Sequence, residues 1–339
     1  MPVAIRLVSL AVFVLVLSPA VGAQECCKNA SQVCICGVAR APGQAVGPND
    51  LSVVRLGTLE REPARTGILL EAGDELTGTA PDVAVELVCP KGSTVKFSNA
   101  FRAVLLPQTG DQDCSFSLLS GSVDILTGEP TQILAGLVIM GSKRTQYGLR
   151  VYRDEGTARL ETLVYEGEAQ CQVIPRGTAF QMEGGSKALI RGDTWQRTKM
   201  SDRDIDRTAS VYARMDVAKA HTSGIVLESP QNAYAAMKSS HAKVLRAPAD
   251  WSSRLDLATW QVRLGSPRQA LYHLGKVAPA AETNARLRAE IAVIQGVAYQ
   301  EMGDQEGAAR HFEAAKKIDP HVDRRKLEER YRSRRGGVR

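Results

Sequence analysis

The hydrophobic pattern divides the chain into an alternating first part and a helical second part. Over Leu51–Val173 apolar and polar positions alternate with a period of two, for example in Val83–Leu87, Val95–Phe97 and Ala158–Val164. This period predicts strands with one buried face and one face in water. Glycines that permit tight turns separate the runs, at positions 67, 73, 92, 110, 121, 141, 156 and 167. We therefore expect an all-β unit, either a sandwich of short strands or a short solenoid.

A helical spacing follows, and it is most regular over Ala289–Val322. The positions that define it are Gly296, Tyr299, Gly303, Ala308, Phe312, Ala315 and Pro320. Small residues fit where two helices touch, aromatic residues fill the groove between them, and proline ends the second helix. The spacing resembles one tetratricopeptide repeat, which is two antiparallel helices in about 34 residues. Such repeats present a concave surface to other proteins and perform no chemistry of their own.

A less regular copy precedes this repeat, over Trp251–Val277. Its Gly265 lies 38 residues before Gly303, which exceeds the ideal period of about 34. Arg207–Lys219 and Gln231–Leu245 predict a third pair of helices. Because a helical stack needs about three units, this pair either completes the stack or packs on the β unit.

The order of the strand motifs resembles the FecR-like domain family. The resemblance rests on Leu70–Leu76, Val83–Leu87, Gly92–Val95, Leu119–Val123 and Val164–Ala169. The chain departs from the family at 89–92, where Asp-Gly is usual, and at 143–147, where Gly-Thr-x-Phe is usual. The resemblance implies an exported β module. In the best-known members this module relays a signal across the inner membrane, whereas this chain is similar to members that carry repeats or envelope-binding modules.

The first 23 residues have the pattern of a secretory signal peptide. Arg6 supplies a positive start, Leu7–Leu17 is apolar, and Val21–Ala23 offers a small-x-small cleavage site. The apolar run is shorter than the roughly 20 residues that a spanning helix needs. An uncleaved anchor is the alternative. We expect a periplasmic or secreted protein without a transmembrane anchor after cleavage.

Seven cysteines fit an oxidising compartment. Cys26, Cys27, Cys34 and Cys36 cluster near the N-terminus, and sequence cannot choose among their three pairings. A four-thiolate metal site is the alternative, but its ligands usually come as Cys-x2–4-Cys pairs, which are absent here. We therefore expect disulfides rather than a metal.

The remaining three cysteines are Cys89, Cys114 and Cys171. Cys89 and Cys114 lie where they could join neighbouring strands. Cys171 would then be left free or used between chains.

The net charge of +6 is concentrated at the C-terminus. Residues 323–339 hold eight basic and three acidic residues, and the body of the chain is close to neutral. A neutral body argues against nucleic-acid binding, which needs a basic face. The tail fits a solvated helix end, with contact to anionic lipid or polymer as the alternative.

Catalytic and cofactor signatures are missing from the sequence. Metal-hydrolase, P-loop, nucleophile-elbow and dinucleotide motifs do not occur. Ser-x-x-Lys occurs at Ser93–Lys96 and Ser240–Lys243, without the partner motifs that penicillin-binding enzymes require. We expect no enzyme activity and no cofactor.

These observations predict a multidomain chain, all-β and then all-α. We expect a signal peptide at 1–23, a Cys-rich segment at 24–48, a FecR-like β domain at 49–195, a helical connector at 200–250, tetratricopeptide-like repeats at 251–322 and a basic tail at 323–339.

The expected function is a scaffold or adaptor of the bacterial cell envelope that binds a protein through its repeats. The first helix of a repeat lines the concave face, which makes Glu290 and Gln295 candidate binding positions. The alternative is an envelope sensor whose β domain binds a receptor or a cell-wall ligand, so contact with the cell wall or the outer membrane stays open.

Overall fold

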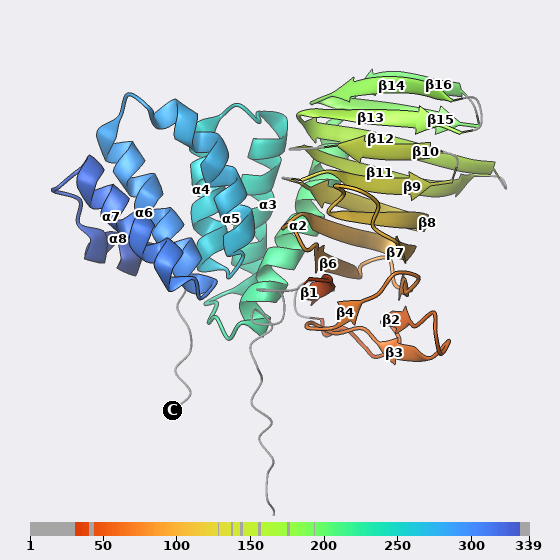
Figure 1. Cartoon of the computed structure of the whole chain (residues 1–339), viewed down its shortest axis with the longest axis horizontal. Helices are drawn as coiled ribbons and strands as arrows, with labels where there is room; N and C mark the ends of the chain where they lie inside the picture. Colours follow the sequence, from red (N-terminus) through yellow and green to blue (C-terminus); the bar gives the residue numbers. More distant parts are fainter. Residues whose placement is uncertain are drawn as a thin grey trace, which may run out of the picture.

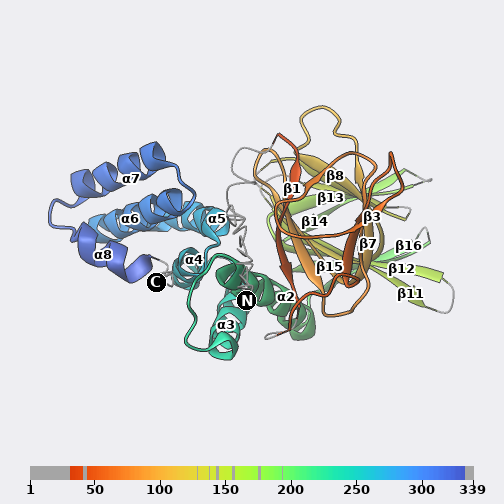
Figure 2. The same cartoon turned by 90° about the horizontal axis from the view of Figure 1, so that it is seen from below.

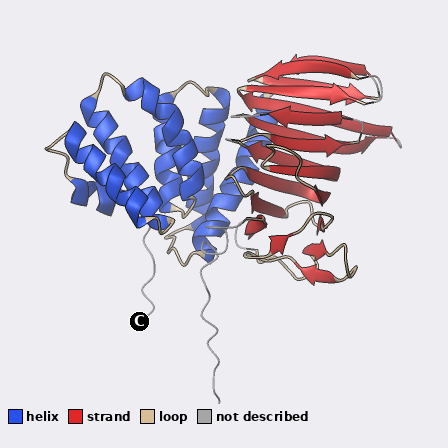
Figure 3. Cartoon of the chain, viewed as in Figure 1, coloured by secondary structure: helices blue, strands red, loops and turns tan. Residues whose placement is uncertain are grey.

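The computed structural model describes residues 31–332, except 41–43, 128, 137, 143–144, 155–156, 175–176 and 193. The expected signal peptide, Cys26 and Cys27 therefore lie outside the described residues. Figure 3 shows the strands and the helices gathered in two separate parts, and along the sequence the strands precede the helices. A β region followed by an α region agrees with the predicted fold class.

The strands of the described chain belong to one hydrogen-bonded network. They are β1 (Val33–Ala39), β2 (Leu51–Val54), β3 (Arg61–Pro63), β4 (Leu69–Leu70), β5 (Glu75–Gly78), β6 (Ala84–Val88), β7 (Thr94–Leu106), β8 (Cys114–Leu126), β9 (Thr131–Ala135), β10 (Val138–Ser142), β11 (Gln146–Asp154), β12 (Thr157–Glu166), β13 (Glu168–Val173), β14 (Thr178–Glu183), β15 (Ser186–Arg191) and β16 (Thr194–Lys199). Strand β1 lies in the Cys-rich segment at 24–48, which the sequence places before the β domain. It nevertheless belongs to the sheet, because it pairs with β4 and β6.

The long strands β7 and β8 fold this network into two layers. The first half of β7 pairs with β6 and its second half with β5. The second half of β8 pairs with β11, and its first half pairs in parallel with β9. The bend falls at Asn99 and Ala100 on β7 and at Gly121 on β8, all with positive φ. A Cβ atom on Gly121 would lie 2.5 Å from the Cβ of Phe101, so glycine is required where β8 bends beside β7.

One apolar core fills the space between the layers. It combines Val85 and Phe97, from the layer that contains β6, β11 and β12, with Phe116, Ile133 and Met140 from the other layer. Val85 and Phe97 occupy apolar positions of the predicted alternating runs. Their burial confirms the predicted strand period.

The predicted wet face of several strands is buried, which corrects the sequence analysis. Strand β6 is buried at every position. On its outer face Glu86 is 1% exposed, and Lys96 beside it on β7 is 3% exposed. Helix α2 lies over this face, with Met215 and Tyr212 packed on Ala84 (Figure 1). An alternating pattern shows that two faces differ, but it does not show what covers the polar one.

Seven α-helices and one short 3-10 helix follow within the described residues. They are α2 (Asp202–Thr222), α3 (Pro230–Arg246), α4 (Trp251–Arg263), α5 (Pro267–Val277), η1 (Ala278–Ala281), α6 (Ala285–Glu301), α7 (Gln305–Ile318) and α8 (Arg324–Tyr331). Consecutive helices pack in the pairs α2–α3, α4–α5 and α6–α7. The helical part thus consists of successive pairs, and the first pair also packs on the sheet.

Individual positions of the helical pattern have the expected local roles. Gly265 and Gly303 have positive φ in the turns inside the second and third pairs. The carboxylate of Asp304 accepts a hydrogen bond from the backbone N–H of Gly307 at 2.8 Å and caps α7. A side chain on Gly296 would lie 2.5 Å from the ring of Phe312, so the close approach of α6 and α7 requires a glycine there.

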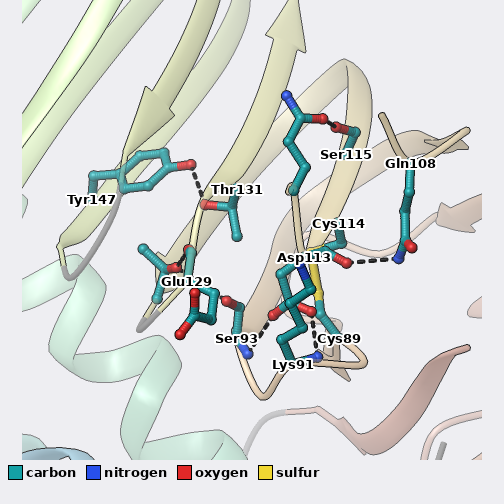
Figure 4. Close-up of a disulfide and its surroundings, with 12 residues drawn as sticks. Cys89, Lys91, Ser93, Gln108, Asp113, Cys114, Ser115, Glu129, Thr131 and Tyr147 are labelled. Atoms are coloured by element: carbon teal, nitrogen blue, oxygen red, sulfur yellow. Dashed lines mark hydrogen bonds between the residues drawn. A yellow bond between two sulfur atoms is a disulfide. The ribbon is translucent and has the colours of Figure 1, made fainter. Parts of the chain in front are cut away.

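Two features of the described chain relate to the predicted periplasmic or secreted location: its disulfides and the hydropathy of its helices. Cys89 and Cys114 form a disulfide, and Asp113 beside it accepts a hydrogen bond from the backbone N–H of Ser93 at 2.8 Å (Figure 4). Cys34 and Cys36 are also disulfide-bonded, and Cys171 is free and buried. Along the described part of the chain, none of the helices combines the length and hydropathy that crossing a membrane demands.

Candidate functional site

A buried polar seam joins the helices to the outer face of β6, β7, β8, β11 and β12. We use "polar seam" for the charged and hydroxyl side chains enclosed between these strands and helices α2 to α5. Its members are Glu86, Lys96, Asp124, Arg150, Tyr165, Glu166, Asp204, Thr208, Asp216, Lys219, His241, Arg254, Ser266, Gln269 and His273.

Glu86 is the most densely paired group of the seam. Its carboxylate contacts the Lys96 ammonium at 3.0 Å, the Lys219 ammonium of α2, and the Gln269 amide of α5 at 2.7 Å. Burial opposes ionisation, but the two ammonium groups outweigh it, so the pKa of Glu86 lies below its usual value. One strand residue thereby holds two helices that are far apart in sequence.

A second cluster joins α2 to β8, β11 and β12. Tyr165 donates a hydrogen bond to Asp124 at 2.9 Å and lies 2.6 Å from the hydroxyl of Thr208. Arg150 donates to Asp204 at 2.9 Å and to Thr208 at 3.1 Å. Burial raises the pKa of Asp124, whereas its neighbours act against that rise. The cluster therefore places the first turns of α2 on the sheet.

The third cluster contains a serine, a histidine and an aspartate but has no catalytic order. Asp216 lies between the other two, 2.7 Å from His241 Nε2 and 2.8 Å from Ser266 Oγ. A nucleophilic relay needs the histidine between serine and carboxylate. Burial opposes the charge of Asp216, but the hydrogen bond from His241 holds its pKa below the usual value. The geometry ties α2 to α3 and α5.

The fourth cluster joins α4 and α5 to the end of β12. Arg254, which is 2% exposed, lies 2.7 Å from the Glu166 carboxylate and 3.2 Å from His273 Nδ1. Burial, with the neighbouring guanidinium, holds the pKa of His273 well below 6.5. His273 is therefore a neutral acceptor in the folded chain. Together the four clusters fix the first two helix pairs on the sheet.

The Ser-x-x-Lys motifs do not form nucleophile–base pairs. Ser93 is buried beside Thr127, and Lys96 is held by Glu86. Ser240 is partly exposed on α3, and Lys243 is exposed. Neither motif is enclosed by a site with the partners that acyl transfer requires.

Glu290 and Gln295 lie on different sides of α6. Five residues along a helix correspond to a rotation of about 140°. Glu290 accepts a hydrogen bond from the Tyr331 hydroxyl of α8, while Gln295 is partly exposed elsewhere on α6. The structure therefore does not join them in one patch, and their role in binding stays a prediction.

Among the described residues, hollows lie on both sides of the helical part. The larger, about 930 Å³, lies between α6 and the segment that leads into α8, with Arg286, Glu290, His321 and Lys326 in its lining. The smaller, about 450 Å³, lies between the turn at Gly92 and helices α5 and α6, with Arg268 and Tyr299 in its lining. Glu290, which contacts α8, lines the larger hollow. We therefore take the surface around this hollow as the candidate binding site.

The basic tail is more ordered than the solvated helix end that we expected. Residues 324–331 form α8, and Tyr331 is 4% exposed within the apolar cluster of the last helix pairs. Residues 333–339 lie outside the described residues. Tyr331 is the aromatic residue among the charges of the tail, and it was the feature of the sequence that indicated packing against the other helices.

Comparisons with known proteins give little guidance. No family model and no curated protein matches the chain. Two crystal structures of a "putative anti-sigma factor" from Parabacteroides distasonis ATCC 8503 align with a TM-score of 0.27 and 11% identity, over 42% of this chain. The aligned part spans 62% of the length of those chains. This similarity is too low to establish a shared fold, so the site must be judged from its own geometry.

Replacing Glu86 with glutamine should destabilise the whole chain. The change leaves Lys96 and Lys219 without their buried counter-charge, and breaking a buried pair costs about 3–5 kcal/mol. Glu75→Gln is the matched control, because its partner Arg102 is 56% exposed and such surface pairs contribute less than about 1 kcal/mol. Urea unfolding measures both variants. Equal, small losses would show that the seam does not stabilise the fold.

The seam also predicts a pH dependence of stability. Unfolded His273 takes up a proton below its ordinary pKa of 6.5, whereas the folded histidine stays neutral. The free energy of unfolding should fall as the pH drops from 7.5 to 5, by up to about 1.4 kcal/mol per pH unit. His273→Gln should flatten that slope. The pKa of the partly buried His311 is lowered as well, but His311 is present in both the unchanged protein and the His273→Gln variant. Identical slopes for these two proteins would therefore contradict the assignment of the pH dependence to His273.

Proposed function

We propose that the chain is an exported, non-catalytic adaptor of the cell envelope that binds a protein through its helical part. In this proposal the pairs α4–α5 and α6–α7 are tetratricopeptide-like repeats on a FecR-like β module. The protein acts in the periplasm or after secretion, which the Cys89–Cys114 disulfide supports.

One observation carries the proposal. Within the described residues the polar seam contacts helices α2 to α5, whereas the later helices α6 to α8 project away from the sheet. Helices α2, α4 and α5 have buried ion pairs or hydrogen bonds to strand residues. Helices α6 to α8 extend away from the strands in Figure 1. A rigid base with a projecting end suits an arm that presents its face to a partner.

A regulator is the second candidate, and the seam favours it specifically. Three of the four clusters combine groups of the sheet with groups of the helices, so a ligand that shifted β6 or β12 would disturb the contacts of α2 and α4. Coupling of this kind requires differential contacts in two states. Binding of cell-wall or outer-membrane material to the β region, with a change in helix protection, is the result that this candidate predicts.

A crosslinking experiment in the native envelope tests the adaptor. The full chain is compared with Arg286→Glu, which reverses a charge in the lining of the larger hollow. Arg310→Glu on the exposed surface of α7 is the matched control. We expect mass spectrometry to find a partner whose recovery falls about tenfold only with Arg286→Glu, since a reversed charge costs roughly 1–2 kcal/mol at a binding surface.

Partners that crosslink equally to all three proteins would remove this face from the proposal. Partners that are retained and map to strand residues would favour the regulator.

A further inference from the structure

Helix α8 does not extend the row of helix pairs but lies across two of them. Arg263 of α4 donates two hydrogen bonds, at 2.9 and 2.7 Å, to the carbonyl oxygen of Arg330. Tyr331 donates to Glu290 of α6, and Arg332 donates to Gln300 of α6 at 3.0 Å. In Figure 2, α8 lies on the side of α6 opposite α7. The helix thus covers a face formed by the first helices of two successive pairs, which we call the α4–α6 face.

Besides these hydrogen bonds, the Arg324 guanidinium lies 3.8 Å from the centre of the Phe312 ring of α7, and a small apolar contact holds α8 in place. Tyr331 is buried, and Leu327 and Val322 are partly buried against the same apolar cluster. The other described residues of α8 are charged, and the Arg325–Glu329 pair points into solvent with side chains 90% and 68% exposed. A helix of eight residues is shorter than the ~12–15 residues that are marginal alone in water. Its helical form therefore depends on docking.

A solvent-open hollow of about 930 Å³ lies beside the docked helix. Charged groups of both signs line it, including Arg286 and Glu290 of α6 and Lys326 of α8. Along this side α8 therefore borders water as well as α6.

We propose that α8 is a built-in occupant of the α4–α6 face, which a partner must displace in order to bind. The partner is an amphipathic helix that repeats the contacts of α8. It has apolar side chains four residues apart, a hydroxyl or cation that reaches Glu290, and a C-terminal carbonyl that accepts from Arg263. This inference rests on the proposed function and adds the class of partner and a self-blocking contact.

The experiment uses the purified full chain and a fluorescent peptide with the sequence of residues 319–332. The variant Leu327→Ala/Tyr331→Ala removes the two apolar anchors of α8. Fluorescence anisotropy should show the peptide binding this variant about tenfold or more tightly than the unchanged protein, because the face is no longer occupied. Arg325→Ala, which changes a side chain of α8 that is 90% exposed, should bind the peptide as weakly as the unchanged protein.

Equal peptide affinity for the anchor variant and the unchanged protein would overturn the proposal. If the anchor variant does not fold, Leu327→Ala alone replaces it, since it removes one apolar anchor of α8 and leaves the α4–α6 face unchanged. That variant should still bind the peptide about threefold more tightly, and no gain would also overturn the proposal. An unchanged protein that is a dimer by light scattering, and a monomer as the anchor variant, would assign the face to a second copy instead.

This measurement is independent of the envelope experiment. If the peptide binds the anchor variant but no envelope protein crosslinks to the α4–α6 face, the proposal of a displaceable helix stands and the adaptor proposal fails. A partner found without peptide binding would retain the adaptor and remove the displacement.

Discussion

The buried carboxylate of Glu86 constrains the arrangement of the whole molecule. An ionised carboxylate that is 1% exposed requires counter-charges and hydrogen bonds. Lys96 on the neighbouring strand supplies one, but the remaining contacts come from Lys219 and Gln269, on helices α2 and α5. The sheet therefore cannot keep this residue ionised and dry without the helices. The β region and the first helix pairs form one stability unit for this reason.

We infer that the buried ion pairs of this chain select one arrangement of the helices on the sheet, a role that such pairs have in some proteins. Apolar contacts such as Leu163 and Tyr165 against Ile205 would allow α2 to slide on the sheet. The contacts of Arg150 with Asp204 and of Arg254 with Glu166 require particular positions of α2 and α4. The direction of the projecting helices is set in this way. The α4–α6 face is then presented at a defined angle, and α8 covers it through a single short helix whose apolar contacts are Leu327 and Tyr331.

The sequence predicted the elements better than their assembly. The period of two located the strands, because burial of Val85 and Phe97 requires alternation whatever covers the other side. The roles of Gly296 and Gly303 followed from local geometry. The seam was not predicted. Glu86, Lys96 and Asp124 lie in register on three neighbouring strands, but charged residues are seldom fully buried, and cross-strand pairs of opposite charge are equally suited to an exposed face. Nor could the sequence show that α8 folds back onto α4, since that contact joins residues 67 positions apart.

Hydrogen exchange of the full chain, followed by mass spectrometry, tests the central claim most directly. The account predicts that β6, α2 and α4 exchange together and only through global unfolding. It also predicts that α8 exchanges much faster, through local opening that leaves α6 and α7 protected. Exchange of α2 and α4 ahead of the strands would contradict the seam as the element that unites the molecule. Protection of α8 equal to that of α6 would contradict its role as a replaceable cover.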